Sequence, residues 1–243
     1  MTIRDKANIN NLTALWSTVG LACGAYCSKT SYSFSTILNS QWPNRVWLNA
    51  PPNWGIINEI LNSCGQNKLP KSLSYWADFG DPTFQFFDSS RFELKSQQVG
   101  MSLDISKKKY PAGERIKLQR ITTDKQAILW EELYPKSFGY VISARTVTAT
   151  MNAIDYFIIY HGQFPIGTVI SFKTNSVVGI HGLGILPPYR KQGFAREVMQ
   201  ELLNKAAEAH MHLATLQASA MGKMIYKDLG FSEDFLVRNY TIL

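Results

Sequence analysis

Cysteine is scarce in this sequence, and its scarcity argues against a disulfide framework. The 243 residues contain Cys23, Cys27 and Cys64 and no other cysteine. An odd number, all in the first half, is not the pattern of a disulfide-stapled domain, and it fits a reducing compartment. We therefore expect buried free thiols in a cytoplasmic protein. Cys23 and Cys27 have no second pair of ligands nearby in the sequence, so no metal site is predicted.

Long apolar runs are also missing. Residues 7–28 carry no charge, but asparagine, serine and threonine interrupt them at short intervals. They match neither a membrane span nor a signal peptide. Leu12, Leu15, Trp16 and Val19 repeat instead at helical spacing, which predicts a packed amphipathic helix. We expect no membrane partner.

Basic clusters of the nucleic-acid type are absent apart from residues 107–109. Lysine and arginine outnumber acidic residues 25 to 18, a net charge of +7 that is spread over both halves of the chain. A mildly basic surface suits a small ligand with several phosphates, so no nucleic-acid partner is expected. The 45% apolar and 18% charged content is that of a globular protein.

The most distinctive feature that is present is a loop between an apolar run and an amphipathic stretch. Residues 180–186 are apolar and predict a strand, and residues 196–209 predict a helix. The loop between them contains Arg190, Gly193 and Ala195. A helix start offers unpaired backbone N–H groups to a phosphate, and glycine lets the backbone approach it closely. Neither a P-loop nor a Gly-x-Gly-x-x-Gly pattern is present, so the segment predicts a different diphosphate-binding loop.

Two segments resemble signatures of the GNAT (GCN5-related) N-acetyltransferase family. Residues 185–195 are similar to that family's acyl-CoA loop, Arg/Gln-x-x-Gly-x-Gly/Ala after a strand and a Pro-x-Tyr turn. Residues 226–231 are similar to its Tyr-x-x-x-Gly-Phe signature. The sequence departs mildly at Ser219, where the family often has Asn, and at Gly222, where it often has Ala. The resemblance covers residues 115–243 and implies the α/β (α+β) acyl-CoA N-acyltransferase fold, a mixed central sheet flanked by helices.

The chain divides near residues 106–113, a charged stretch that ends in proline and glycine. We expect a GNAT domain over 111–243, preceded by a smaller α/β domain over 1–110. In the GNAT domain the patterns predict strands at 116–121, 156–160, 165–172, 177–186 and 213–218, and helices at 124–133, 138–151, 196–209 and 221–229. In the first domain they predict strands at 44–49, 73–77 and 92–105, and helices at 54–61 and 82–89.

The order of elements in the first domain echoes that in the second. In each, a proline pair is followed by a helix, a strand, a second helix and a final strand that begins near a phenylalanine, Phe92 or Phe231. One interpretation is a degenerate second copy of the GNAT domain that has lost its cofactor loop. The alternative is chance similarity between two α/β segments.

The resemblance also implies roles for particular residues. Tyr226 would be the general acid for the CoA sulfur. No general base is evident, because Gly179 lies where many members carry a carboxylate; His181 on the same strand face is the candidate, with Asp155, His161 or a water chain as alternatives. The implied cofactor-binding residues are Leu183, Gly184, Ile185, Arg190, Lys191, Gln192, Gly193, Phe194, Ala195, Arg196 and Ser219.

Three functions are compatible with the sequence. The first is an enzyme that transfers an acetyl group from acetyl-CoA to a primary amine of a small molecule or peptide, by direct attack in a ternary complex. The second is a non-catalytic acyl-CoA sensor or interaction module, and the third an acyltransferase that uses a donor such as an aminoacyl-tRNA. A homodimer is possible. Candidate residues for receiving a cationic acceptor are Trp130, Glu131, Glu132, Tyr134 and Tyr140.

Overall fold

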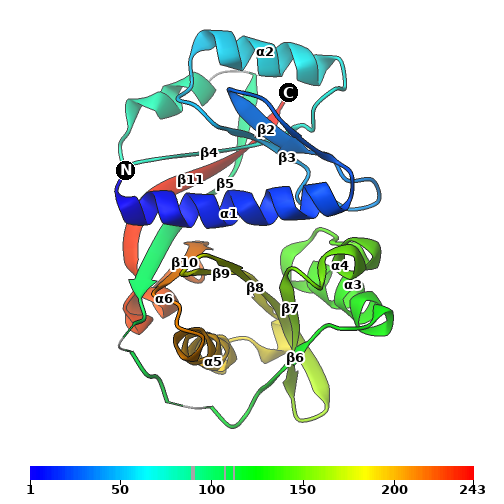
Figure 1. Cartoon of the computed structure of the whole chain (residues 1–243), viewed down its shortest axis with the longest axis vertical. Helices are drawn as coiled ribbons and strands as arrows, with labels where there is room; N and C mark the ends of the chain where they lie inside the picture. Colours follow the sequence, from blue (N-terminus) through cyan, green and yellow to red (C-terminus); the bar gives the residue numbers. More distant parts are fainter. Residues whose placement is uncertain (89–90, 107, 112) are drawn as a thin grey trace.

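The computed structural model describes residues 1–88, 91–106, 108–111 and 113–243. Residue 89, the last of the helix expected at 82–89, and residues 107 and 112 in the expected domain boundary lie outside this part. The described residues build one 11-stranded sheet with helices on both faces (Figure 1). The strands are β1 (Tyr26–Ser28), β2 (Tyr32–Ser35), β3 (Arg45–Leu48), β4 (Ser72–Ala77), β5 (Phe92–Asp104), β6 (Lys117–Arg120), β7 (Asp155–His161), β8 (Phe164–Thr174), β9 (Val177–Ile185), β10 (Leu213–Ala218) and β11 (Ser232–Ile242).

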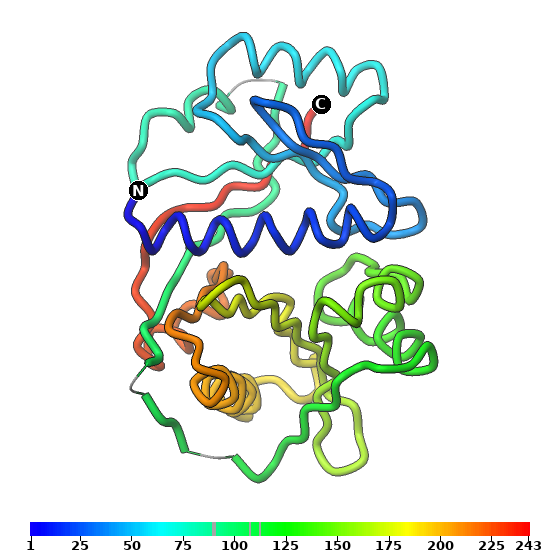
Figure 2. The backbone as a smooth tube through the Cα atoms, in the orientation of Figure 1, coloured from blue at the N-terminus to red at the C-terminus, as the bar shows by residue number. Residues whose placement is uncertain are grey.

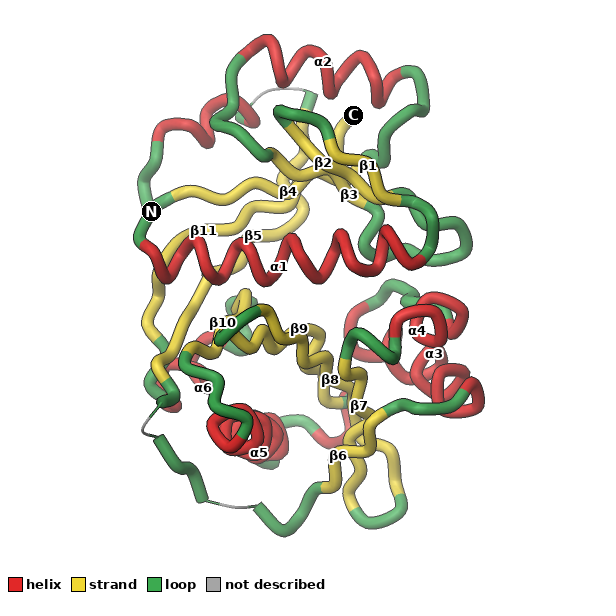
Figure 3. Tube along the Cα trace, in the orientation of Figure 1, coloured by secondary structure: helices red, strands yellow, loops and turns green. Residues whose placement is uncertain are grey.

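The strand order shows that the two halves of the chain exchange strands. The order is β1-β2-β3-β4-β11-β5-β10-β9-β8-β7-β6. Thus β11, the last strand, lies among strands of the first half, between β4 and β5. In turn β5 lies between β11 and β10, and it pairs antiparallel with both. The two halves therefore share one hydrogen-bonded sheet, although each has its own helices (Figure 3).

The same topology occurs on either side of the β5–β11 pair. In the first half, β3 and β4 are parallel and are joined through helix α2 (Trp54–Gly65). In the second half, β9 and β10 are parallel and are joined through helix α5 (Phe194–Glu208). The connection before the helix spans residues 49–53 in the first half and 186–193 in the second. The first half thus repeats the strand–helix–strand unit with a shorter connection where the second half has its expected phosphate loop.

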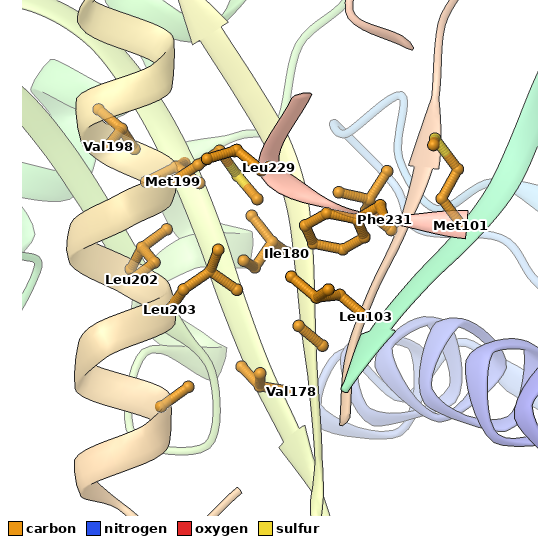
Figure 4. Packing of buried hydrophobic residues seen from close by; sticks show 14 of the residues in the cluster. Met101, Leu103, Val178, Ile180, Val198, Met199, Leu202, Leu203, Leu229 and Phe231 are labelled. Carbon is orange, nitrogen blue, oxygen red and sulfur yellow. The ribbon is translucent and has the colours of Figure 1, made fainter. Parts of the chain in front are cut away.

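Helix α5 covers one face of the sheet and forms the core of the second half. Its buried side chains pack against β9, where Val178 and Ile180 lie toward the helix, and Met101 and Leu103 of β5 belong to the same buried cluster (Figure 4). These strand residues alternate with residues that face the opposite side, as expected for a sheet covered on both faces. The buried residues of α5 are Phe194, Val198, Met199, Leu202, Leu203 and Ala206.

Helix α1 (Ile3–Ala22) lies across the middle of the molecule, between the helices of the two halves (Figure 2). Thr2 caps it in a capping box with Asp5. Leu12, Leu15 and Trp16 are buried, as the helical spacing predicts. The helix packs against β8, β9, β10 and β5, on the sheet face opposite to α5. The first 22 residues therefore help to cover the sheet of the second half.

Two asparagines on the buried face of α1 bind the sheet. Asn8 and Asn11 are both 0% exposed. Asn8 Nδ2 donates to the carbonyl oxygen of Met101 over 3.0 Å, and Asn11 Nδ2 donates to that of Phe172 over 3.0 Å. Buried amides without partners are costly, so these bonds fix both the register and the rotation of α1 on the sheet.

Several boundaries differ from those expected. Helix α3 (Asp124–Phe138) runs through Pro135 and ends only at Gly139, which has φ 75°. Ser143 caps α4 (Ala144–Thr150), which is shorter than the helix expected at 138–151. The segment expected to be helical at 82–89 is the 3-10 helix η1 (Pro82–Phe87). Helix α6 (Lys223–Leu229) and the turn η2 (Pro187–Tyr189) complete the described helices.

Strands β1 and β2, which form the sheet edge beside β3, were not predicted. All three cysteines are free, but the expectation that they are buried is wrong for Cys27, which is exposed, and Cys23 is half-buried. The exposure of Cys27 follows from its place on edge strand β1. In the described parts of the chain, no helix is both long and apolar enough to cross a membrane.

We predict that Asn8→Ala lowers the free energy of unfolding by about 2 kcal/mol, because it leaves the buried carbonyl of Met101 and the amide of Gln217 without their partner. The matched control is Asn10→Ala on the exposed face of the same helix, which should stay within about 0.5 kcal/mol of the parent. Urea unfolding measures both. Equal losses in the two variants would contradict a structural role for the buried amide.

Candidate functional site

Strands β9 and β10 separate where the expected cofactor site begins. Their parallel pairing ends at Gly179 and Thr215, although β9 continues to Ile185. Beyond that point β9 pairs only with β8, and the register slips between His181 and Gly184. Gly182 lies in this bulge with φ 54°, a conformation that glycine adopts readily. One edge of β9, including Leu183 and Gly184, therefore has backbone groups available to a ligand.

The loop after β9 presents a series of unpaired backbone donors. Gly193 has φ 86° and begins α5 without a side-chain cap. Within the described parts of the chain, nothing accepts a hydrogen bond from the amides of residues 191–195. They lie at the positive end of the dipole of α5. Unpaired amides at a helix start are the donors that the expected phosphate loop requires, and phosphate binding by this loop stays a prediction.

Arginine side chains hold this loop in place. Arg190 Nε donates to the carbonyl oxygen of Ile185 over 2.9 Å, which ties the loop to the end of β9. Arg115 forms an ion pair with Glu197 and donates to the carbonyl oxygen of Gln192 over 3.1 Å. Sequence reasoning missed Arg115, because it lies some 80 residues before the loop in a segment without a motif.

Tyr226 on α6 faces the space between the separated strands. Burial raises the pKa of its hydroxyl to about 12. No described residue forms a hydrogen bond with that hydroxyl, and the ring packs edge-on against Phe231, with 6.0 Å between the ring centroids. A half-buried, protonated and unpaired phenol can donate a proton or a hydrogen bond to a bound ligand.

His181 lies on the face of β9 that α1 covers. Its Nε2 is 3.1 Å from Asn11 Oδ1, and its Nδ1 is 3.2 Å from Gln217 Oε1. Burial lowers the pKa of the imidazole to about 4, and the bond to Gln217 offsets part of this effect. The ring is therefore neutral at pH 7. A Cβ atom at Gly179 would overlap Asn11 and His181, so these two side chains fill the space in which a carboxylate at position 179 would lie.

A cavity of about 470 Å³ lies beside Tyr226, His181 and the open part of β9, and residues 190–195 of the loop are not among its lining residues. His181, Leu183, Ser219 and Tyr226 line it on the side of the second half. The first half contributes residues from α1, β3 and β5, and β11 contributes Asn239. This volume is typical of a site for a small ligand. The full lining is Leu12, Leu15, Trp16, Trp42, Arg45, Ser96, Gln97, Gln98, Tyr134, Phe138, Tyr140, Ile170, Ile180, His181, Gly182, Leu183, Leu216, Gln217, Ser219, Tyr226 and Asn239.

Three other residues predicted for the cofactor site make contacts within the protein. Phe194 is buried in the core, and Arg196 pairs with Asp228 over 2.6 Å at the surface. Ser219 lies three residues before the N-cap of α6 and does not cap the helix. Its hydroxyl accepts from the amide of Gly222, and Gly222 is the N-cap, because a turn precedes the helix.

The alternative bases and most of the acceptor candidates lie away from the cavity. Asp155 pairs with Arg120, and His161 Nδ1 is 2.8 Å from the carbonyl oxygen of Arg115. Glu131 accepts from the amide at the start of α4 over 3.0 Å. Of the aromatic candidates, Tyr134 and Tyr140 line the cavity, and Trp130 does not.

No group of His, Cys, Asp and Glu side chains that could hold a metal ion is found among the described residues. His210 and His212 lie at the surface.

Comparison with known families identifies the second half. Residues 119–238 match the family model described as "Acetyltransferase (GNAT) domain". This half of the chain is a GNAT acetyltransferase domain. Among curated proteins no significant match is found.

Solved structures show that the GNAT likeness extends over the whole fold. A GCN5-related N-acetyltransferase from Kribbella flavida aligns with a TM-score of 0.69 and 12% identity, covering 97% of this chain and 96% of that one. One from Sphaerobacter thermophilus aligns with a TM-score of 0.59 and 10% identity, covering 86% and 76%. A "tandem GNAT protein from the clavulanic acid biosynthesis pathway" has a TM-score of 0.57 and 11% identity, covering 86% and 77%. At these identities the likeness is one of fold.

We predict that His181 makes the fold less stable in acid. Its pKa is about 4 in the folded chain and about 6.5 when unfolded. Between these values the unfolded chain binds more protons, so the free energy of unfolding falls as pH is lowered through this window, by on the order of 3 kcal/mol. His181→Gln should show a shallower fall in urea unfolding between pH 7 and pH 4. The surface variant His210→Gln should follow the parent, and a matching slope in His181→Gln would contradict the assignment.

Proposed function

We propose that this GNAT protein transfers an acetyl group from acetyl-CoA to a primary amine of a small molecule or peptide, by direct attack in a ternary complex. The observation that carries the proposal is that the open edge of β9 at Leu183 and the unpaired hydroxyl of Tyr226 line one cavity. The unpaired amides before α5 do not line this cavity, but they follow directly after the end of β9. The three free cysteines suit a reaction in the reducing cytoplasm.

The residues at the loop fit a CoA diphosphate. The amides of residues 191–195 provide neutral donors at a helix start, and Gly193 leaves the cradle without a side chain. The open edge of β9 at Leu183 and Gly184 offers backbone groups of the kind that an amide-containing pantetheine arm can pair with. When bound, acetyl-CoA supplies a thioester carbonyl for the amine to attack.

Tyr226 is proposed as the general acid for the sulfur that leaves. Its raised pKa of about 12 keeps the hydroxyl protonated throughout the neutral range. Because no described group accepts its proton, the hydroxyl is available to a ligand in the cavity. A positioned acid of this kind contributes about 10²–10⁴-fold to a rate.

His181 is proposed to receive the proton of the attacking amine. It is neutral, lines the cavity, and lies between two oxygen acceptors, Asn11 Oδ1 and Gln217 Oε1, that can stabilise an added N–H. Its low pKa makes it a weak base, which favours the alternative of an acyl-CoA sensor without catalysis. An acetyl-transfer assay of His181→Gln tests the role of this histidine. The rate falls if His181 receives the proton, and it is unchanged if water carries the proton away.

The loop assignment predicts that Gly193→Ala weakens acetyl-CoA binding by at least about tenfold, because a side chain is strained at φ 86° and distorts the amide cradle. Gly80→Ala is the control, since Gly80 also has a positive φ of 77° and a Cβ atom there would meet nothing within 4 Å. Calorimetric titration measures the dissociation constants. If Gly193→Ala has the same dissociation constant for acetyl-CoA as the parent, the loop assignment is wrong. It is also wrong if the parent binds no acetyl-CoA.

The acid assignment predicts that Tyr226→Phe lowers kcat about 10²-fold or more and leaves the dissociation constant of acetyl-CoA within about twofold. Thiol release during acetylation of an amine panel measures kcat. Because the pKa of Tyr226 is about 12, loss of its proton should not reduce the parent's activity between pH 7 and pH 10. If Tyr226→Phe keeps the parent's kcat, another group donates the proton. If the parent binds acetyl-CoA but transfers nothing, the sensor function is favoured.

A further inference from the structure

Arg45, at the start of β3, has unused donors in the wall of the cavity. Its Nη1 donates to Ser74 Oγ over 3.0 Å and to Asn239 Oδ1 over 3.3 Å. Trp16 covers one face of the guanidinium, with Cζ 4.6 Å from the ring centroid. Nε is sealed from solvent and has no hydrogen-bond partner, and Nη2 has no acceptor in the described part of the chain. An arginine in this position has capacity for a planar acceptor.

Arg45 also lacks a counter-ion. It forms no ion pair with any described carboxylate, and burial lowers the pKa of its guanidinium. Apart from the neutral His181, the other described residues that line the cavity cannot carry a charge near pH 7 without a large pKa change. A buried cation without a partner is costly, and an anion bound beside it recovers much of that cost.

A row of hydrogen bonds crosses the sheet between Arg45 and the proposed catalytic groups. Its bonds are 2.6 to 3.3 Å long. The row runs through Arg45, Ser74, Asn239, Gln98, Gln217 and His181. Except for Ser74, all of these side chains belong to the lining of the cavity. One molecule in the cavity can therefore contact Arg45 at one end and the groups around His181 and Tyr226 at the other.

We propose that the acceptor is an amine that also carries a carboxylate, that is, an amino-acid-like molecule. Its carboxylate binds Nη2 of Arg45, the donor that is neither sealed nor engaged, and its amine lies at the His181 and Tyr226 end. Aromatic side chains that line the cavity, among them Trp16, Trp42 and Tyr140, contact its apolar part. This proposal rests on the proposed acetyl transfer, but binding to Arg45 can be tested without it.

The charge of the wall favours a carboxylate over other anions and over polyamines. One guanidinium balances one carboxylate, whereas a phosphate monoester carries about −1.5 to −2 at pH 7 and would keep an unbalanced charge. A polyamine would add positive charge beside Arg45 without a described carboxylate in the wall to offset it. Glu131, earlier a candidate for receiving a cation, is engaged at the start of α4 instead.

The first experiment uses acetate as the carboxylate probe on the full-length ¹⁵N-labelled protein. The Nε–H signal of Arg45 is identified by its loss in Arg45→Met and in Arg45→Lys. We expect acetate, at constant ionic strength with chloride, to shift this signal in a saturable manner, and inorganic phosphate to shift it less. Arg238→Met is the matched control. Arg238 lies on β11 beside Asn239, stacks on Phe84 with 4.1 Å between Cζ and the ring centroid, and does not line the cavity.

An Arg45 signal that does not respond to acetate overturns the proposal, and so does a stronger response to phosphate. A response that persists unchanged in Arg238→Met supports it. Two Arg45 variants are used so that the assignment survives if one of them does not fold.

The second experiment compares acetyl transfer to L-phenylalanine and to 2-phenylethylamine, which differ only in the carboxylate. We expect kcat/KM in the parent to be at least about tenfold higher for L-phenylalanine than for 2-phenylethylamine. In Arg45→Met we expect the two kcat/KM values to become about equal, because KM for L-phenylalanine rises. An equal preference in the parent overturns the proposal. Acetate could bind at Arg45 while neither of these amines, nor any other amino acid, is acetylated. That result would support the anion site at Arg45 and contradict the proposed acetyltransferase function.

Discussion

The side-chain amides of Asn8 and Asn11 are the points at which α1 is fastened to the sheet. Each donates to a backbone carbonyl of a strand, Met101 for Asn8 and Phe172 for Asn11, and each also holds a polar side chain of the cavity, Gln217 or His181. Because amides buried without partners are destabilising, α1 can lie on the sheet in one position only. That position places Trp16 against Arg45 and closes the cavity on the side of the first half. The wall of the cavity, the contact of His181 with Asn11 and the contact between the two halves all depend on it.

Local features of the site could be predicted from the sequence, and features that depend on distant contacts could not. The loop at residues 185–195 and the Tyr226 segment are continuous in sequence, and each carries its own turn and helix-start residues, so the GNAT domain was recognisable. Helix α5 and strand β10 lie where the patterns place them, within two residues. The exchange of β5 and β11 has no signature in either strand, because pairing across a sheet depends on partners far along the chain. Arg45 was missed for the same reason, since its neighbours Trp16 and Asn239 come from opposite ends of the sequence.

The two halves use one topology for different purposes. In the second half the long connection before α5 forms the cradle of amides, and in the first half the short connection before α2 leaves no such loop. The first half instead supplies Arg45, Trp42 and part of the cavity floor. This division agrees with the hypothesis of a duplicated domain whose first copy lost the cofactor loop, which stays a prediction, as does the boundary between 1–110 and 111–243. Because the two halves exchange strands, dividing the chain at any single residue would not give two domains with complete sheets.

The place of β11 in the sheet has a consequence for biosynthesis. Strands β4 and β5 are translated before β11. They form no backbone hydrogen bonds with each other in the sheet, because β11 lies between them. A ribosome releases β11 only after the rest of the second half has been made. Until then β4 and β5 present open edges, which are sites for pairing with another chain. Contacts between residues so far apart also slow folding. The cavity between the halves can therefore be completed only after β11 has been made and has paired with both strands.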